Sequence, residues 1–339
     1  MKKQLIATAV AASMSAAALA DVAITGNAKF EYDNTDNNGT TTNTTNTEVN
    51  LMVKGKNGDT GVVANFELNT HGGNTADGAG IDVEDLYMTT KVGDVAVKAG
   101  NWASGTSAHL GEIDNGGRSN NKIDLSYTMG DIKVYAGSAG SAGNGDGEIN
   151  DNMYAGVVLS NVMGNTINLK KHNEVQDSYG IKGSVGGLNY RVEAASHDTE
   201  GDTTFAELST SLGAVKLNYA MLSADNAAAL DEDDSSLFAV STGTADNVTA
   251  TGQKQIWAST TLAGTVVDVK MGTIEKGIET RGAGANQLKD RDYTQVKATR
   301  KLSSGSTAVI TFTDQDIVYG TSHGTSSKEN LEIELNVAF

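Results

Sequence analysis

The sequence predicts an all-β protein, a transmembrane antiparallel β-barrel of sixteen to eighteen strands, with eighteen favoured by the count. Apolar and polar residues alternate with period two in segments of about eight to eleven residues, as expected for strands that are apolar on one face. Short glycine-containing turns alternate along the chain with long polar connections, as in membrane barrels. After residue 20 there is no apolar run of about eighteen residues, which excludes a helical membrane protein.

Residues 1–20 have the pattern of a secretory signal peptide. Lys2 and Lys3 form a basic start, and the apolar stretch that follows is too short to span a membrane comfortably. Ala18-Leu19-Ala20 supplies the small residues of a cleavage site. We therefore expect the chain to be exported and cleaved before Asp21, and residues 21–339 to form a single barrel domain in a bacterial outer membrane.

The strand signal is clearest at the two ends of this domain. In the last strand one face is apolar and the intervening residues are polar; the apolar residues are Leu331, Ile333, Leu335, Val337 and Phe339. The first segment alternates in the same way, with Ile24, Ala28, Phe30 and Tyr32 on one face. Similar alternation recurs in 123–129 and 215–221. Strands with one apolar and one polar face suit a wall between lipid and water.

The connections determine the strand count. Eight short turns contain glycine, which supplies the positive φ that tight hairpins need; their glycines are Gly58, Gly93, Gly130, Gly164, Gly186, Gly213, Gly264 and Gly305. Longer polar segments, predicted as loops, separate the hairpins at 33–48, 71–81, 101–121 and 223–253. Eight hairpins and one strand at each end give eighteen strands. The hairpin around Gly264 is the least distinct, so sixteen strands stay open.

A soluble β-sandwich or β-solenoid is the structural alternative, because both also alternate and also use glycine turns. The strand lengths, the unequal connections and the absence of a repeat of fixed period favour the barrel.

Composition excludes several functions. Without Lys2 and Lys3 the domain has 23 basic and 42 acidic residues, and 23 − 42 = −19; nucleic acid is therefore a poor partner. The chain has no cysteine, and its five histidines fall in or beside predicted loops without the spacing of metal ligands. No catalytic motif is present, so we expect neither an enzyme nor a bound cofactor. Acidic clusters in predicted loops are candidates for divalent cations that bridge lipopolysaccharide; they are Asp231-Glu232-Asp233-Asp234, Asp82-Glu84-Asp85 and Asp146-Glu148-Asp151.

The polar faces of the strands carry the candidate transport residues. With the apolar faces toward lipid, nine basic residues should line the lumen; they are Lys29, Lys54, Lys98, Lys133, Lys182, Arg191, Lys216, Lys270 and Lys297. Several aromatic residues near predicted strand ends suggest interfacial girdles; they are Tyr32, Tyr87, Trp102, Tyr154, Tyr219 and Tyr293.

The start of the domain, Ala18 to Phe30, and its end, Leu331 to Phe339, resemble the general trimeric porins of Proteobacteria. The resemblance implies a homotrimer of sixteen-stranded barrels in contact with outer-membrane lipid and lipopolysaccharide. It also implies that Phe339 serves as a signal for the barrel-assembly machinery. The third external loop would fold inward as a pore constriction; here it corresponds to 101–121 and contains Glu112, Asp114 and Arg118.

Together these features predict a water-filled channel for passive diffusion of small hydrophilic solutes and ions. Glu112 and Asp114 are expected to face basic wall residues, which would set up a transverse field; those wall residues are Lys29, Lys54, Lys98 and Lys133. Net charge alone predicts a preference for cations, whereas the lysines of the lumen oppose it. The alternatives are a solute-specific channel of eighteen strands and a structural or adhesive surface barrel. Aromatic residues make up only 5% of the chain, which offers little material for a stacking path.

Overall fold

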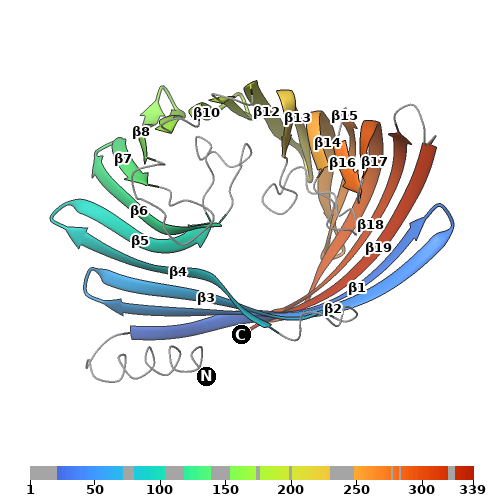
Figure 1. Cartoon of the computed structure of the whole chain (residues 1–339), viewed down its shortest axis with the longest axis horizontal. Helices are drawn as coiled ribbons and strands as arrows, with labels where there is room; N and C mark the ends of the chain where they lie inside the picture. Colours follow the sequence, from blue (N-terminus) through green and yellow to red (C-terminus); the bar gives the residue numbers. More distant parts are fainter. Residues whose placement is uncertain are drawn as a thin grey trace.

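The computed structural model describes residues 21–71, 80–103, 118–138, 153–172, 176–197, 201–229, 248–275, 278–281, 284–319 and 325–339. This part of the chain folds into one antiparallel sheet of nineteen strands, curved into a barrel (Figure 1). The strands are β1 Asp21–Asn37, β2 Thr40–Asn57, β3 Thr60–His71, β4 Gly80–Val92, β5 Val95–Ala103, β6 Arg118–Met129, β7 Ile132–Ser138, β8 Met153–Val162, β9 Asn165–His172, β10 Gln176–Val185, β11 Leu188–His197, β12 Gly201–Leu212, β13 Val215–Ala229, β14 Val248–Leu262, β15 Thr265–Glu275, β16 Ile278–Arg281, β17 Gly284–Ser303, β18 Ser306–Tyr319 and β19 Thr325–Ala338.

The sheet closes because its first strand pairs with its last. β1 pairs with β2 on one side and with β19 on the other, from Asn27↔Ala338 to Asn37↔Lys328. The short strand β16 continues the position of β15, since both pair with β14 and with β17. Counted as one, they leave eighteen positions in the barrel wall. The predicted barrel and the favoured count of eighteen are therefore confirmed.

No helix among the described residues is long and apolar enough to cross a membrane.

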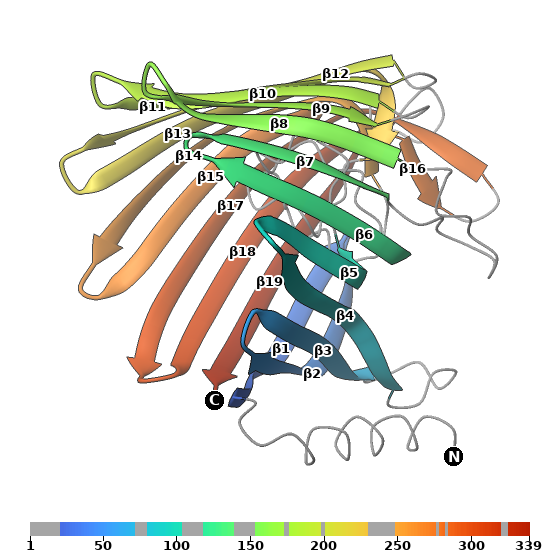
Figure 2. The same cartoon turned by 90° about the vertical axis from the view of Figure 1, so that its left-hand side faces the viewer.

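All eight predicted glycine turns join neighbouring strands of the described chain, and each contains a glycine with positive φ. They lie at one rim of the barrel. The C-terminus lies at the same rim, where Ala338 N–H donates to Gly305 O at 2.6 Å beside the turn between β17 and β18 (Figure 2).

The predicted polar loop at 33–48 is wrong. β1 and β2 run straight through it, and the two-residue turn Asn38-Gly39 joins them with φ of 53° and 80°. Asn-Gly is the preferred sequence for such a hairpin, and the threonines that follow favour extended backbone. Polarity misled the prediction because this hairpin is polar on both faces.

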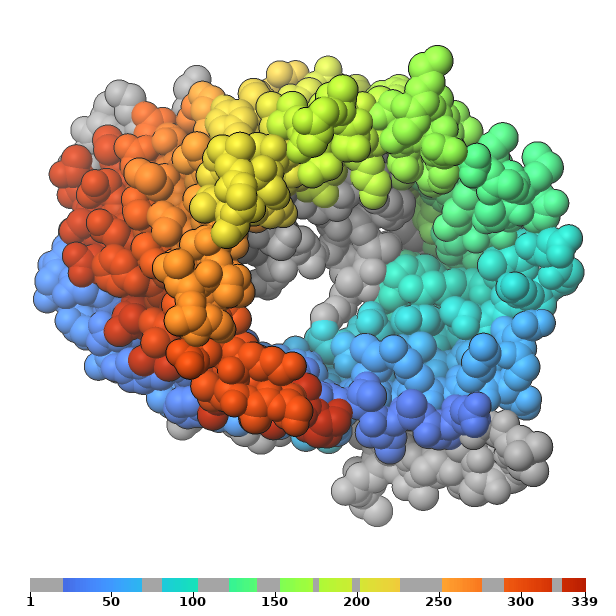
Figure 3. Space-filling model, turned by 180° about the vertical axis from the view of Figure 1, so that it is seen from behind, coloured from blue at the N-terminus to red at the C-terminus, as the bar shows by residue number. Residues whose placement is uncertain are grey.

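The pairing divides every strand into two faces. Paired residues share a face, and following the pairs from strand to strand around the barrel returns to the starting strand on the same face. One face, which we call the outer face, presents exposed apolar side chains such as Ile310, Phe312 and Leu335. The other, the inner face, carries polar residues such as Thr313 and Gln315, which are buried. This is the distribution expected for a barrel with lipid outside, and a hollow ring is visible in Figure 3.

Glycines allow tyrosine rings to lie flat against the inner face. A Cβ atom at Gly272 would lie 2.5 Å from both Lys254 O and Tyr293 Oη. The Tyr293 hydroxyl donates to Gln255 Oε1 at 2.7 Å and accepts from Gln253 Nε2 at 3.1 Å. A side chain at Gly272 would therefore push against backbone and against a fully hydrogen-bonded phenol.

Gly272→Ala is expected to destabilise the barrel by about 1–3 kcal/mol, the usual cost of overpacking. The matched control is Gly252→Ala on the neighbouring strand β14, because a Cβ there meets only the flexible Glu275 carboxylate at 3.2 Å and Leu222 O at 3.5 Å. The midpoint of urea unfolding in detergent compares the two variants. Equal midpoints would contradict the packing assigned to Tyr293.

Candidate functional site: the inner wall

The candidate site is the inner face itself. The pairing puts all nine basic residues predicted for the lumen on this face, and they come from nine strands between β1 and β17. Further basic residues that the sequence reading did not select lie on the same face and are buried: Lys122, Lys170, Arg291 and Lys328. Lys122 and Lys328 lie near the starts of β6 and β19, close to connections, where the alternating pattern is short.

Most of the predicted lysines form no ion pair with the described residues. Among the residues that the structure describes, none of six lysines has a carboxylate within the 4 Å of an ion pair; they are Lys54, Lys98, Lys133, Lys182, Lys216 and Lys270. From β5 to β15 the inner-face carboxylates of the described strands are few: Asp124, Glu193, Glu207 and Asp268. This part of the wall is therefore basic, although the chain as a whole is acidic.

Aromatic rings hold several of these ammonium groups. Lys98 Nζ lies 3.9 Å from the ring centroid of Tyr87 and 4.4 Å from that of Trp102. Lys216 and Lys270 lie 5.4 Å and 5.8 Å from the ring of Trp257. An aromatic face attracts a cation without neutralising its charge. These lysines are thus positioned while they stay available to an anion.

The aromatic girdle predicted from the sequence is largely wrong. Of its six members only Tyr32 and Tyr219 lie on the outer face. The other four lie on the inner face; they are Tyr87, Trp102, Tyr154 and Tyr293. Both tryptophans of the chain belong to the basic wall. Position near a strand end predicted a girdle, but the parity of each residue within its strand decides the face.

Arg191 is held differently from the lysines. Its Nη2 lies 3.0 Å from Glu207 Oε2, and its guanidinium lies 5.0 Å from the ring of Phe205. Phe205 belongs to a small apolar cluster on the inner face with Ala220 and Leu222, against which Trp257 packs. An arginine fixed by a carboxylate and a ring presents its remaining donors in one orientation.

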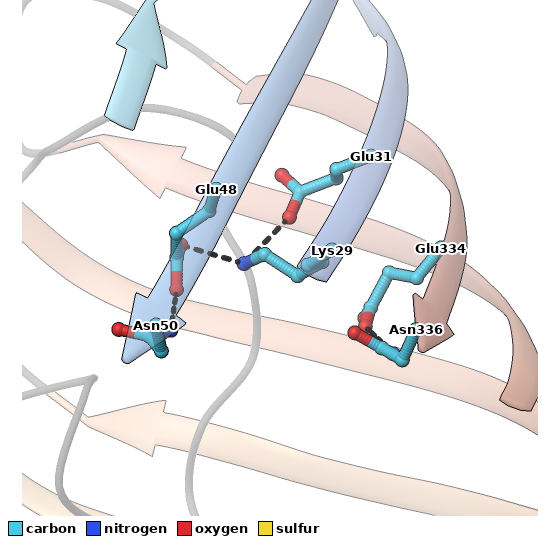
Figure 4. A network of polar contacts seen from close by, with 6 residues as sticks. All are labelled: Lys29, Glu31, Glu48, Asn50, Glu334 and Asn336. Atoms are coloured by element: carbon cyan, nitrogen blue, oxygen red, sulfur yellow. Dashed lines mark hydrogen bonds and ion pairs between the residues drawn. The ribbon is translucent and has the colours of Figure 1, made fainter. Parts of the chain in front are cut away.

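The wall where the barrel closes has the opposite character. Lys29 Nζ lies 3.0 Å from Glu31 and 3.3 Å from Glu48, and Asn336 donates to Glu334 at 3.1 Å (Figure 4). Asp33 and Glu332 extend this acidic cluster on the same inner face, opposite each other in the pairing of β1 and β19. The predicted wall lysine Lys29 is therefore ion-paired within an acidic cluster, and the inner face is polarised between this seam and the basic wall.

The residues predicted at the constriction are only partly described. Glu112 and Asp114 lie outside the described residues. Arg118 begins β6, where it pairs with Ala103, so it belongs to a strand and not to a loop. Whether these residues face the wall lysines stays a prediction.

His172 lies beside a connection, as predicted, because it ends β9; it is buried, at 5% exposure, with its ring 6.0 Å from that of Tyr154. The predicted loop position of the acidic cluster Asp82-Glu84-Asp85 is wrong. Asp82, Glu84 and Asp85 lie in β4, where Glu84 is the extra residue of a bulge. No group of three or more acidic or histidine residues in the described ranges could hold a metal ion. The other two acidic clusters lie outside those ranges.

No protein-family model and no curated protein sequence matches this chain. Solved structures do resemble it. Pseudomonas aeruginosa OpdL shares 11% identity at a TM-score of 0.65, over 94% of this chain and 99% of OpdL. P. aeruginosa OccK2 (OpdF), in complex with glucuronate, shares 13% identity at 0.60, over 94% and 98%. Acinetobacter baumannii OccAB4 shares 11% identity at 0.60, over 94% and 98%. This likeness shows a common fold.

The comparison corrects the resemblance to general trimeric porins. The structures that match are eighteen-stranded outer-membrane channels of the OprD (Occ) type, which are substrate-specific and not enzymes. The chain has the same number of strand positions, whereas sixteen were implied by the porin resemblance. The start and end motifs led to the wrong family because an alternating first strand and a terminal phenylalanine are compatible with any barrel in which the first strand pairs with the last.

Proposed function

We propose that this chain is a substrate-selective outer-membrane channel through which small anionic, hydrophilic solutes diffuse passively. It would reach the outer membrane after removal of residues 1–20. The observation that carries the proposal is the row of inner-face lysines without ion-pair partners. These charges lie on many strands, so an anion in the lumen would meet one after another.

Electrostatics supports this reading over a general porin. A unit charge interacts with a lysine at 4 Å by about 1 kcal/mol even in bulk water, and by more beside a low-dielectric wall. The acidic seam on β1, β2 and β19 would repel the anion toward the basic wall. The same field would orient a solute that carries one charged end, which gives selection among solutes of similar size.

The glucuronate complex of OccK2 supports a sugar acid as the class of solute to test first. Glucuronate carries one carboxylate for a lysine, and its hydroxyls match an inner face rich in asparagine, glutamine and threonine. A structural or adhesive role would not require unpaired charges inside the barrel.

Uptake into liposomes that contain the purified protein tests the proposal. Glucuronate is expected to enter several-fold faster than glucose, and its rate is expected to saturate because the wall binds it. Equal, unsaturated rates would indicate a general porin, and absence of uptake of either would overturn the channel function.

A further inference from the structure

Two neighbouring hollows lie on the inner face near the rim of short turns. One, of about 250 Å³, is lined by Asp124, Lys133, Tyr135, Val158, Thr166, Asn168 and Lys182. The other, of about 400 Å³, is lined mainly by Thr166, Lys182, Ser184, Arg191, Glu207 and Ser209. Lys182 and Thr166 line both and are partners in the pairing of β9 and β10. Together the hollows have the size of typical small-molecule sites.

The hollows lie close to the ends of their strands. Lys182 lies three residues before the end of β10, Arg191 three residues after the start of β11, and Gly164 belongs to the turn between β8 and β9. The end of β5 at Ala103 and the start of β6 at Arg118 lie at the opposite rim. A solute that has crossed the barrel from that rim would meet these hollows last.

The floor of the smaller hollow is fixed by a glycine. Any side chain at Gly156 would collide with the Tyr135 ring, so the glycine lets this ring lie against the wall. The Tyr135 hydroxyl donates to Asn168 Oδ1 at 3.0 Å, and both residues are buried. Lys133 Nζ lies 5.8 Å from the same ring. The polar groups of the hollow are thus held in place before any solute arrives.

The two basic side chains of the hollows, Arg191 and Lys182, differ in how firmly neighbouring residues hold them. Arg191 is oriented by Glu207 at 3.0 Å and by the Phe205 ring. Lys182 is exposed and has no carboxylate within ion-pair distance among the described residues. It stands opposite Arg191 in the pairing of β10 and β11. A carboxylate between them would gain a free ammonium and a fixed guanidinium, while Ser184, Ser209 and Asn168 would be in reach of hydroxyls.

We infer that the two hollows form an exit subsite, which retains a six-carbon sugar acid with its carboxylate at Lys182 and Arg191 before release from the rim of short turns. The inference rests on the proposed function, because it assumes that anionic solutes reach this rim. It adds a defined binding position near the rim of short turns.

Single-channel recording in planar bilayers tests the inference with glucuronate as the probe and glucose as its uncharged analogue. The wild-type channel is expected to show brief current interruptions with glucuronate and none with glucose. Lys182→Gln is expected to shorten the interruptions roughly tenfold, equivalent to about 1.4 kcal/mol of binding. Because Lys182 is an exposed side chain, the variant should fold as the wild type does.

Lys171→Gln is the control, since Lys171 is also an exposed lysine, on the neighbouring strand β9, but lies on the outer face and outside both hollows. Retained interruptions in Lys171→Gln, with loss in Lys182→Gln, support the exit subsite. Equal effects in the two variants, no effect in Lys182→Gln, or no interruptions in the wild type would overturn it. If glucuronate permeates faster than glucose but causes no current interruptions, the proposed function is supported and the exit subsite is refuted.

Discussion

Replacing Lys98, Lys216 and Lys270 together with glutamine is expected to lower the anion-to-cation permeability ratio by roughly tenfold. Each of these ammonium groups is held by an aromatic ring and lacks an ion-pair partner among the described residues. If each contributes about 0.5 kcal/mol to a passing anion, the three together reach the 1.4 kcal/mol that corresponds to a tenfold change. The reversal potential in a potassium chloride gradient measures the ratio.

The control variant removes three positive charges from the outer face of the barrel instead of the inner face. Lys171, Lys254 and Arg300 lie on the outer face, where Lys171 and Lys254 pair with Asp177 and Glu275. Their replacement with glutamine should leave the permeability ratio nearly unchanged. If both triple variants shift the ratio equally, overall charge and not the inner wall determines selectivity.

Replacing Gly26 with valine is expected to reduce the yield of closed barrel by roughly tenfold, given an overpacking cost of about 1–3 kcal/mol. Gly26 and Phe339 exchange two backbone hydrogen bonds of 2.9 Å at the seam between β1 and the C-terminus. A Cβ at Gly26 would collide with Asn50 O and lie 2.8 Å from the Phe339 ring. The fraction of heat-modifiable protein in unboiled gel samples measures closure.

Ala28→Val is the control for this prediction, because Ala28 follows Gly26 on the same outer face of β1 and already has a Cβ. It should give the wild-type yield. Phe339→Ala distinguishes the effect of backbone closure at the seam from a role of the Phe339 ring in assembly, since it keeps the backbone hydrogen bonds but removes the ring. A normal yield in Gly26→Val would contradict the tight closure, whereas a low yield in Phe339→Ala alone would favour a role for Phe339 as an assembly signal.

The strands were predictable because lipid imposes one physical rule along the whole chain. Side chains that face hydrocarbon are predominantly apolar, so period two survives in most strands and the glycine turns between strands are conspicuous. The hairpin at Asn38-Gly39 does not follow this rule, because the residues near its turn are polar on both faces. The Asn38-Gly39 pair is the sequence signal that could have identified this hairpin.

The nine basic residues of the wall followed from the same alternation, whereas their environments did not. Whether a lysine is free depends on neighbours in adjacent strands, which lie far away in sequence. Lys29 meets Glu48 only through the pairing of β1 with β2, and Lys98 meets Tyr87 only through the pairing of β4 with β5. Trp102 faces inward because it alternates in step with Lys98 and Gly100 along β5, although a bulge on β6 shifts the pairing beside it.

The resemblance to general porins failed for a related reason. It depended on the two ends of the domain, where closure of any such barrel demands an alternating strand. The number of strand positions distinguishes the two types of channel, and it is a property of the whole barrel. Net charge does not describe the inner wall, because several carboxylates of the described strands lie on the outer face, including Asp292, Asp314 and Asp316.

The reversal potential of the wild-type protein in a planar bilayer, with a tenfold gradient of potassium chloride, tests the central claim most directly. The basic inner wall predicts a potential of the sign that indicates a preference for chloride, in a protein whose formal net charge is −17. A potential of the opposite sign, toward potassium selectivity, would show that the acidic groups control permeation and would contradict the account.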